Sequence, residues 1–336
     1  MEKYIITGGL GFIGSTLSEF LVEKEKEVLI IDNEYSGVIT NISEEFVSKI
    51  TIVKDDIRNP EIKKYFNKND IVIHLAAISS LPECQNNPDL AYDINVRGTI
   101  NILEICRIKG INKCIFASTS AIYENNTEDT FCETLVVNPT LIYSMTKKNC
   151  EDLCLSYVKN YNMDIRVIRF FNVYGGNQDY RRKSPPLTIY IINQLINNLQ
   201  PILHSDGKQK RDYIYIDDLL DLIYKIIETD NLKGCIMNAC SNTLISVEEI
   251  FNTIAQELNS DIKPKYVESK NLWNGYNNLV NGHYKINENI IENEVNKITL
   301  GDNTFAKNKL NWDLKHTFKT GIKQLLHNFC NSSNRI

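Results

Sequence analysis

Three side chains with hydroxyl or ammonium groups have a spacing that would allow them to take part in proton transfer. Tyr143 and Lys147 are four residues apart, so on a helix they lie one turn apart on the same face. A cation beside a phenol favours the phenolate and should lower the pKa of Tyr143. Thr119, near the end of an apolar run, could add a second hydroxyl. These groups predict proton exchange between Tyr143 and a hydroxyl of a bound small molecule.

This spacing is weak evidence by itself, because Tyr266 and Lys270 repeat it. What distinguishes Tyr143 is the upstream apolar run that leads to Thr119, which Tyr266 lacks. The structural alternative is that Thr119 caps the end of a strand and that Tyr143 packs at an interface.

A glycine-rich turn follows the first β-branched run directly. Gly9, Gly11 and Gly14 satisfy the pattern G-x-G-x-x-G, which lets the backbone approach a pyrophosphate at a helix N-terminus. Asp32 ends the next such run about 20 residues later, where a carboxylate can accept both hydroxyls of an adenosine ribose. A 2′-phosphate would meet like charge there, so we expect NAD and not NADP. A tight turn and a plain turn carboxylate are the structural alternatives.

The elements that must position these residues alternate along the first half of the chain. Short β-branched runs occur at Tyr4 to Ile6, Val28 to Ile31, Ile50 to Val53, Ile71 to Leu75, Cys114 to Ala117 and Ile165 to Phe170. Stretches with helical spacing of apolar residues lie at Gly14 to Glu23, Leu90 to Lys109 and Ser144 to Asn160. This alternation predicts an α/β protein with a Rossmann-type, doubly wound parallel sheet.

A smaller mixed α/β domain should follow, because the sequence becomes polar and proline-containing after Gly176. Asp212 to Ile226 again has the pattern of a strand and then a helix, so the chain should return to the first domain. We therefore expect residues 1–176 plus about 211–243 to form an NAD-binding domain. The substrate domain should consist of residues about 177–210 together with residues 244–336.

Composition excludes several classes of function. The 336 residues carry a formal charge of -5, which argues against binding nucleic acid or an anionic membrane. No apolar stretch approaches the length of about 20 residues that a membrane span needs, and a signal-peptide pattern is missing, so we expect a cytoplasmic protein. The nine cysteines are scattered and read as reduced thiols. The five histidines do not cluster, so no metal site is expected.

Taken together, these residues resemble the extended short-chain dehydrogenase/reductases, the family of NAD-dependent nucleotide-sugar epimerases and dehydratases. The resemblance covers most of the chain and extends to the stretch from Arg211 to Asp218. It implies that NAD is the cofactor and that Asn95 steadies the active-site helix. The residues that it assigns to the cofactor are Gly8, Gly11, Phe12, Ile13, Gly14, Asp32, Asn33, Asp56, Ile57, Leu75, Ala76, Ala77, Asn95, Tyr143 and Lys147.

The resemblance also implies a substrate, a nucleotide-linked sugar carrying UDP, and a reaction at its C4 hydroxyl. The residues that it places against the substrate are Ser80, Thr119, Ser120, Tyr143, Asn172 and Arg211. Arg211 would bind the diphosphate, because a guanidinium can bond two phosphate oxygens at once. Tyr143, Thr119 and Lys147 would be catalytic. Tyr143 would take the O4 proton while C4 is oxidised, giving a 4-keto sugar.

Two positions after Thr119 favour one reaction of the family. The 4,6-dehydratases carry an acidic pair there, whereas this chain has Ser120 and Ala121, neither of which can serve as the acid or base of an elimination. A 4-epimerase is therefore expected, with a dehydratase, a 4-keto reductase or an idle NAD-binding regulator as alternatives. Glu124, where the family usually has glycine, is expected to be a surface carboxylate.

Some features depart from the family or extend it. A second phosphate-binding arginine has no clear equivalent, and Arg181 and Arg182 either supply that charge or are exposed. Residues 272–284 look like an elaboration of the substrate domain. The helices expected at Leu90 to Lys109 and Ser144 to Asn160 imply a homodimer joined by a four-helix seam.

Overall fold

The computed structural model describes residues 2–111 and 113–331. Its main element is a seven-stranded sheet with the strand order β10-β6-β5-β4-β1-β2-β3, in which all neighbours run parallel. The strands are β1 (Lys3–Thr7), β2 (Glu27–Asp32), β3 (Ile50–Lys54), β4 (Ile71–His74), β5 (Lys113–Thr119), β6 (Asp164–Phe170) and β10 (Ile236–Ala239). The predicted doubly wound parallel sheet is confirmed.

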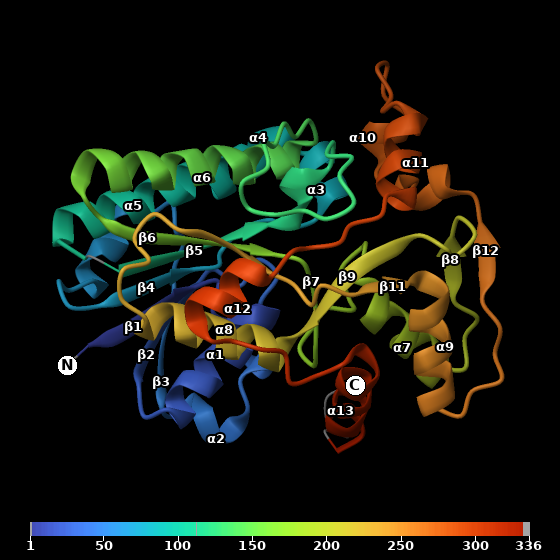
Figure 1. Ribbon diagram of the computed structural model, residues 1–336, viewed down its shortest axis with the longest axis horizontal. Helices are drawn as coiled ribbons and strands as arrows, with labels where there is room; N and C mark the ends of the chain where they lie inside the picture. The colour runs from blue at the N-terminus through green and yellow to red at the C-terminus, as the bar shows by residue number, and fades with distance from the viewer. Residues whose placement is uncertain (1, 112, 332–336) are drawn as a thin grey trace.

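Helices cover both faces of this sheet, as Figure 1 shows. On one face lie α5 (Gly98–Lys109) and α6 (Ile142–Tyr161), whose apolar residues share a core with β4 and β5. On the other face lie α1 (Phe12–Glu23) and α8 (Ile216–Glu228), packed on a second core. Burial of both faces explains why the strands have nearly continuous apolar sequences.

Several short helices complete this half of the molecule. They are η1 (Ile39–Asn41), α2 (Glu44–Val47), η2 (Pro60–Tyr65), α3 (Leu81–Asn86), α4 (Pro88–Tyr92), the π-helical η3 (Asp93–Arg97) and η4 (Ser120–Tyr123). The segments α4, η3 and α5 follow one another without a break, so the helix predicted from Leu90 to Lys109 is present with a π turn in it. Gly110, at φ 69°, ends α5, in the left-handed conformation typical of a helix C-terminus.

A smaller half, drawn at the right of Figure 1, carries two small sheets. Its strands are β7 (Asn172–Tyr174), β8 (Ile202–His204), β9 (Lys210–Tyr215), β11 (Leu244–Ser246) and β12 (Lys265–Val267). Its helices are α7 (Leu187–Ile196), α9 (Val247–Glu257), η5 (Ser269–Trp273), α10 (Asn277–Val280), α11 (Glu288–Asn296) and α13 (Phe318–Asn331). Between them, α12 (Thr304–Leu310) packs on β10 and α8. The exact division into two domains stays a prediction.

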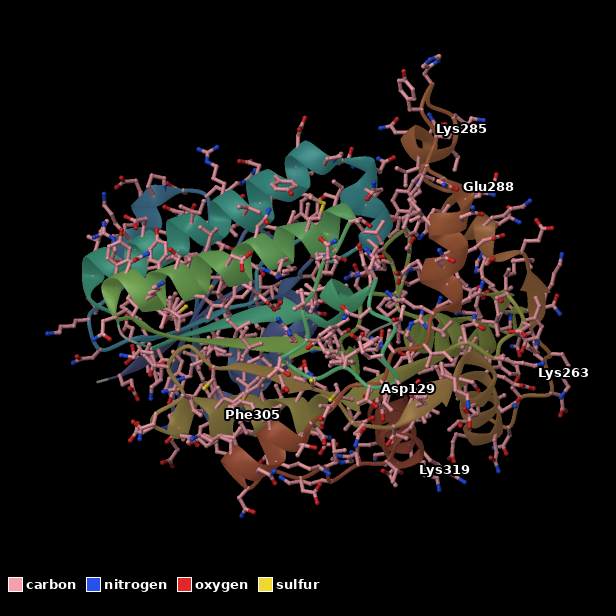
Figure 2. The ribbon with its side chains drawn as sticks, turned by 45° about the horizontal axis from the view of Figure 1, so that its top comes forward. Asp129, Lys263, Lys285, Glu288, Phe305 and Lys319 are labelled. Atoms are coloured by element: carbon pink, nitrogen blue, oxygen red, sulfur yellow. The ribbon has the colours of Figure 1, made fainter. Side chains whose placement is uncertain are left out.

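Residues 269–296 form a compact projection with its own small core. Trp273, Leu279 and Ile291 pack together there, and the cluster includes Leu141, the residue that precedes α6. Figure 2 shows Lys285 and Glu288 on the part that stands away from the remaining molecule. The segment therefore connects the smaller half to the start of α6.

Within the described residues, no helix is both long and apolar enough to cross a membrane. The same part of the chain contains no group of three or more potential metal ligands among its His, Cys, Asp and Glu residues.

Candidate active site

A cavity of about 990 Å³ opens at the carboxyl ends of the sheet strands and extends into the smaller half. Its floor is formed by the loops that follow β1 and β4, adjacent strands at which the strand order of the sheet reverses. Ligands of open α/β sheets bind at such a reversal. The fold therefore brings the glycine-rich turn, the catalytic candidates and all but one of the predicted substrate residues to one cavity.

The glycine-rich turn is shaped for a closely approaching ligand. A Cβ atom on Gly14 would lie 2.3 Å from the carbonyl oxygen of Gly8, and one on Gly8 would lie 2.8 Å from the backbone of Ala76. Gly11 forms the N-cap of α1, and Phe12 and Ile13 in its first turn line the cavity. The free N–H groups of a first helical turn attract phosphate, so the turn fits a pyrophosphate.

Asp32 lies at the end of β2 with both carboxylate oxygens held. The Leu10 amide donates to Oδ2 at 3.0 Å and the Glu34 amide donates to Oδ1 at 2.7 Å. Burial raises the pKa of Asp32, and these two bonds oppose the rise. Each oxygen keeps a further lone pair, and the side chain lines the cavity. This arrangement fits a pair of ribose hydroxyls.

Another part of the predicted cofactor site is built around Asp56. Asn33 donates to its carboxylate at 2.8 Å, and Arg58 donates from Nε at 2.8 Å and from Nη2 at 2.7 Å. The hydrogen bond from Arg58 is the main reason why the pKa of Asp56 falls to about 2. Asn33, Asp56 and Ile57 all line the cavity. The wall opposite consists of Leu75, Ala76 and Ala77 after β4.

Asn95 does not line the cavity. It is buried in η3, accepts a hydrogen bond from the Ile78 amide at 2.8 Å and donates to the Ile78 carbonyl at 3.0 Å. It also donates to Thr146 Oγ1 on α6 at 3.0 Å. Asn95 therefore fastens the loop after β4 to the helix that carries Tyr143.

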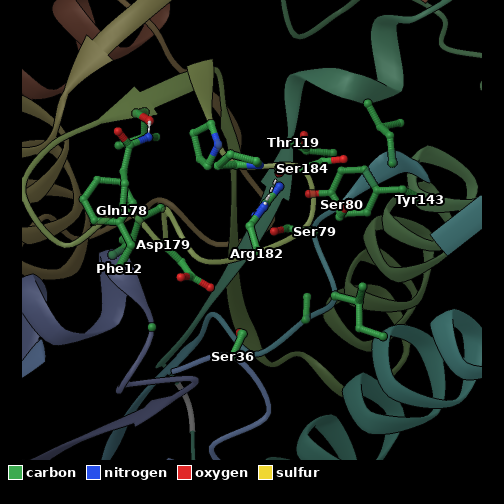
Figure 3. Close-up of a pocket in the computed structure, with 18 of the residues that line it drawn as sticks. Phe12, Ser36, Ser79, Ser80, Thr119, Tyr143, Gln178, Asp179, Arg182 and Ser184 are labelled. Atoms are coloured by element: carbon green, nitrogen blue, oxygen red, sulfur yellow. Dashed lines mark hydrogen bonds between the residues drawn. The ribbon is translucent and has the colours of Figure 1, made fainter. Parts of the chain in front are cut away.

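The three catalytic candidates meet in the cavity. Tyr143 is hydrogen-bonded to Thr119, and Figure 3 shows the two side chains facing each other beside Ser80. Lys147, one turn along α6, donates from Nζ to the Ala117 carbonyl at 2.8 Å and lies over the Phe116 ring. By contrast, Tyr266 is 40% exposed on β12 and Lys270 pairs with Glu268.

The expected lowering of the Tyr143 pKa is wrong for the protein alone. Burial raises the pKa of Tyr143 to about 12, and the hydrogen bond with Thr119 is the largest effect opposing it. The reason is that only 8% of Tyr143 is exposed, while Lys147 directs its ammonium group to a backbone carbonyl. Burial also lowers the pKa of Lys147. Spacing along the helix could not reveal either effect.

Glu124 has a partner that the sequence did not indicate. Its carboxylate accepts hydrogen bonds from the Leu141 amide and the Ser144 hydroxyl, both at 2.8 Å, and from the Thr140 amide. It caps α6, whose own N-cap residue, Leu141, has no capping side chain. The expectation of a simple surface carboxylate is therefore wrong, because the chain folds Glu124 back onto the helix that begins after Leu141.

The predicted substrate residues divide into those that line the cavity and one that does not. Ser80, Thr119, Tyr143, Asn172 and Arg211 line it, whereas Ser120 lies in η4 outside its lining. Ser80 Oγ is buried and has no hydrogen-bond partner among the described residues. A buried hydroxyl without a partner is costly, so Ser80 is suited to bond a ligand.

Arg211 is engaged by the protein itself. Its Nη2 donates to the carbonyls of Glu294 at 2.6 Å and Val295 at 3.2 Å, at the end of α11. Burial lowers the pKa of Arg211, with Glu294 acting in the opposite direction. Its Nη1 donates to the Lys210 carbonyl at 3.1 Å. These three carbonyls leave other guanidinium N–H groups for a ligand, so a ligand that binds Arg211 meets a side chain held by the projection.

The loop of residues 177–186 carries Arg181 and Arg182, which the sequence left undecided between the site and the surface. Arg182 lines the cavity, and Figure 3 shows its guanidinium reaching toward Ser80 and Tyr143. Its Nε donates to the Ser184 carbonyl at 2.6 Å, and no described carboxylate lies within ion-pair distance of it. Lys183 lies over the Tyr276 ring. Arg181 is exposed and pairs with Asp179 at 3.2 Å.

One further cavity residue was missed entirely. Gln209 donates to the His204 carbonyl at 2.7 Å, while its buried Oε1 has no partner among the described residues. A lone glutamine in a charged turn carries no sequence signal for such a role.

Comparison with known proteins gives a consistent picture. The family described as GDP-mannose 4,6 dehydratase matches residues 5–325. A Methanocaldococcus jannaschii protein with the provisional name UDP-glucose 4-epimerase is 34% identical over 257 residues, covering 76% of this chain and 82% of the relative. A UDP-glucuronate 4-epimerase from Thermodesulfobacterium geofontis is 30% identical over 345 residues, covering 97% and 96%.

Relatives with other reactions are also present. A UDP-N-acetyl-alpha-D-glucosaminuronate decarboxylase from Bacillus cytotoxicus is 30% identical, covering 83% of this chain and 88% of the relative. Among solved structures, the UDP-N-acetylglucosamine 4-epimerase of Methanobrevibacter ruminantium, in complex with UDP-N-acetylmuramic acid, has a TM-score of 0.85 and 26% identity over 98% of both chains. The UDP-glucose 4-epimerase of Thermotoga maritima has the same TM-score and 25% identity, covering 98% and 99%.

Proposed function

Because this chain belongs to the extended short-chain dehydrogenase/reductases, in the family of NAD-dependent nucleotide-sugar epimerases and dehydratases, we propose that it is a 4-epimerase. Its substrate is a UDP-linked hexose or N-acetylhexosamine, whose C4 hydroxyl it inverts through a transient 4-keto sugar. The observation that carries the proposal is the contact between Tyr143 and Thr119 in the cavity, with Lys147 on the next turn of the same helix.

NAD fits the first part of the cavity, where the glycine-rich turn would hold its pyrophosphate and Asp32 its ribose hydroxyls. When bound, NAD supplies the reversible oxidation of the C4 alcohol to a ketone. The neighbouring cavity residues, Ser80 and Asn172 among them, are then available to the sugar and the diphosphate.

The residues of the chain handle the proton and the orientation of the sugar. Tyr143, as the phenolate, takes the O4 proton when C4 is oxidised and returns it when the ketone is reduced on its opposite face. Thr119 contacts Tyr143 and can bond the same oxygen. Lys147 supplies positive charge near the phenolate. The substrate neither gains nor loses atoms, and no external reductant is consumed.

The competing reactions differ in their products, so one experiment separates them. The purified protein is incubated without added cofactor with UDP-glucose and with UDP-N-acetylglucosamine, and products are read by proton NMR and mass spectrometry. Unchanged mass with an inverted C4 supports the proposal. Loss of one water would favour a dehydratase and would contradict the argument from Ser120 and Ala121. In a second incubation, with NADH and a 4-keto sugar nucleotide added, consumption of NADH would indicate a 4-keto reductase. Binding of NAD without turnover in either incubation would indicate an idle regulator.

A second substrate class, a UDP-linked hexuronic acid, is favoured by Arg182. A guanidinium without a carboxylate partner, directed to the same part of the cavity as Ser80 and Tyr143, suits a sugar carboxylate at two points. Arg182→Met should then lower kcat/KM for UDP-glucuronate by about 10- to 100-fold and leave that for UDP-glucose nearly unchanged. Arg181→Met, which affects the exposed neighbour, is the control. Equal losses for both sugars would contradict this second candidate.

We also propose that the protein is a homodimer joined through α5 and α6, as the resemblance implies. Large apolar side chains are exposed on these helices, including Ile108 at 66% and Tyr161 at 53%. Light scattering during size-exclusion chromatography should give twice the chain mass of 38.6 kDa. Ile108→Glu should shift the protein to the monomer, and a monomeric wild type would contradict the proposal.

A further inference from the structure

A buried ion pair lies directly behind the catalytic residues. Glu151 on α6 is 1% exposed and Arg169 on β6 is 3% exposed. Arg169 donates from Nε at 2.9 Å and from Nη2 at 2.8 Å, one bond to each carboxylate oxygen. Ser118 adds a third bond to the same carboxylate at 2.5 Å. A buried carboxylate with three donors is firmly fixed in position.

This pair continues the line of catalytic residues along α6. Tyr143, Lys147 and Glu151 follow one another at four-residue spacing and therefore share one face of the helix. That face meets three consecutive residues at the end of β5. Tyr143 is bonded to Thr119, Lys147 donates to the Ala117 carbonyl and Glu151 accepts from Ser118. The Glu151 contact is thus the last of three that set the position of α6 against β5.

The strand behind is held by the same carboxylate. In the parallel register of β5 and β6, Ser118 lies opposite Arg169, so Glu151 joins both strands to the helix. Arg169 also donates to the Tyr123 hydroxyl at 2.7 Å, which is bonded to Asn238 on β10 at 3.0 Å. The pair therefore anchors the catalytic helix to three adjacent strands of the sheet.

Charge gives Glu151 a second role, because Lys147 is only 4% exposed. Burial is the main effect that lowers the pKa of Lys147. The thiols of Cys150, Cys84 and Cys154 oppose it most, and Glu151 is the only carboxylate among the opposing groups. The titratable and charged groups facing this region are Tyr143, Cys150, Glu151 and Cys154 on α6, Cys84 on α3, His74 on β4, and Arg169 on β6 beside Glu151, with Tyr123 and Glu133 facing Arg169. Without the Glu151 charge, Lys147 would be a buried cation with no carboxylate among these groups to balance it. Arg169 would keep only Glu133 as a carboxylate in electrostatic contact.

We propose that Glu151 is a positioning residue of the reaction, which holds the catalytic helix against Ser118 and Arg169 and keeps Lys147 charged beside Tyr143. This inference rests on the proposed function, in which Tyr143 and Lys147 manage the O4 proton. A merely structural ion pair would affect stability alone. The two roles differ in how activity depends on pH.

The test is the pH dependence of kcat and KM for the wild type, Glu151→Gln and the double variant Glu151→Gln/Arg169→Gln, with melting temperature and bound NAD measured alongside. Glu151→Gln should lower kcat at neutral pH by about 10-fold or more and change KM by less than about two-fold. The alkaline fall of kcat should move to lower pH by about one unit, because Lys147 loses its proton more easily. The double variant also removes the Arg169 cation. The alkaline fall of its kcat should therefore return toward the pH at which it occurs in the wild type.

Asp164→Asn is the matched control, since it removes a carboxylate that pairs with a buried arginine, Arg166, on the same strand at 2.6 Å. It should reduce stability and leave the pH profile unchanged. The proposal that Glu151 keeps Lys147 charged would be overturned if kcat of Glu151→Gln had the wild-type pH dependence. It would also be overturned if the double variant did not restore the alkaline fall of kcat to the wild-type pH. If Glu151→Gln fails to fold, Ser118→Ala can be used instead. It keeps the ion pair and removes only the hydrogen bond from Ser118 to Glu151, and kcat should still fall several-fold. An unchanged kcat there would overturn the positioning role.

The outcome is separable from the proposed function. If the wild type turns over no UDP-sugar, the proposed function is wrong. The inference about Glu151 can then still be tested by a measurement that needs no turnover. NMR titration of ¹³C-labelled lysine side chains, with Lys147 assigned through Lys147→Arg, should then show Lys147 losing its proton at lower pH in Glu151→Gln than in the wild type. Identical titration would overturn the charge role.

Discussion

At the residue scale, the proposed reaction depends on the proton affinity of Tyr143. A phenol whose pKa burial raises to about 12 is protonated at neutral pH, whereas the base must be the phenolate. A raised pKa therefore means that the active fraction grows with pH. We expect kcat to increase between about pH 6 and pH 9, before the loss of the Lys147 proton reverses the trend. Steady-state measurements of kcat across this pH range test the predicted increase. A kcat that falls as the pH rises from 6 would contradict the prediction.

Tyr143→Phe separates proton transfer from binding. The variant keeps the ring that packs in the cavity and loses only the hydroxyl, so turnover should fall by about 10²- to 10⁴-fold while NAD remains bound. Absorbance of the released cofactor after denaturation measures the second quantity. Retained turnover would exclude Tyr143 as the base.

The residues that could be predicted from the sequence are those whose role depends on neighbours along the chain. Gly11 and Gly14 act within one turn, and Tyr143 and Lys147 within one helix. Ser80 and Arg211 could be placed only by resemblance. The direction of the Tyr143 pKa could not be predicted, because it depends on burial by segments far away in the sequence.

At the scale of elements, α6 carries the proposed catalytic residues Tyr143 and Lys147 and is fixed at several points along its length. Glu124 caps its start, Asn95 bonds Thr146 in its second turn, and Glu151 ties it to β5 and β6. Each partner comes from a different part of the chain. Strand and helix positions were predictable from apolar periodicity, whereas these ties were not, since no local pattern marks Glu124 as a cap.

Loss of the Glu124 cap should be measurable in both stability and rate. Glu124→Gly restores the residue usual in the family and removes the acceptor for the Leu141 and Ser144 donors. We expect the free energy of unfolding to fall by about 1 kcal/mol and kcat to fall several-fold, since Tyr143 lies in the first turn. Urea denaturation and steady-state kinetics measure the two effects. Glu128→Gln, an exposed change in the following loop, is the control. Wild-type values for both quantities would contradict the capping role.

At the scale of the whole molecule, the cavity depends on how the projection of residues 269–296 meets the start of α6. Its core includes Leu141, and its last helix accepts two bonds from Arg211. The sequence indicated an elaboration at residues 272–284 but could not show that it reaches across to α6. The reason is that the contacts join segments separated by well over a hundred residues.

Loosening the projection should weaken substrate binding, whereas an equal loss of packing elsewhere should not. Ile291, 1% exposed in α11, lies outside the cavity lining, so Ile291→Ala should destabilise the local core by about 2–5 kcal/mol and raise KM for the UDP-sugar. Hydrogen exchange of residues 269–296 follows the local loosening. Ile254→Ala, on α9 in the core shared with α1 and α8, should lower the melting temperature with little change in KM. Equal KM values for the two variants would contradict the coupling.

The most direct test of the central claim is the fate of the hydrogen at C4. UDP-glucose carrying deuterium at C4 is incubated with the wild-type protein in ordinary water without added NADH, and the product is examined by NMR and mass spectrometry. The account predicts a product of unchanged mass, with C4 inverted and the deuterium still at C4, because the same hydride returns to the other face. Loss of the deuterium to water, or its transfer to C6 with loss of one water, would contradict it.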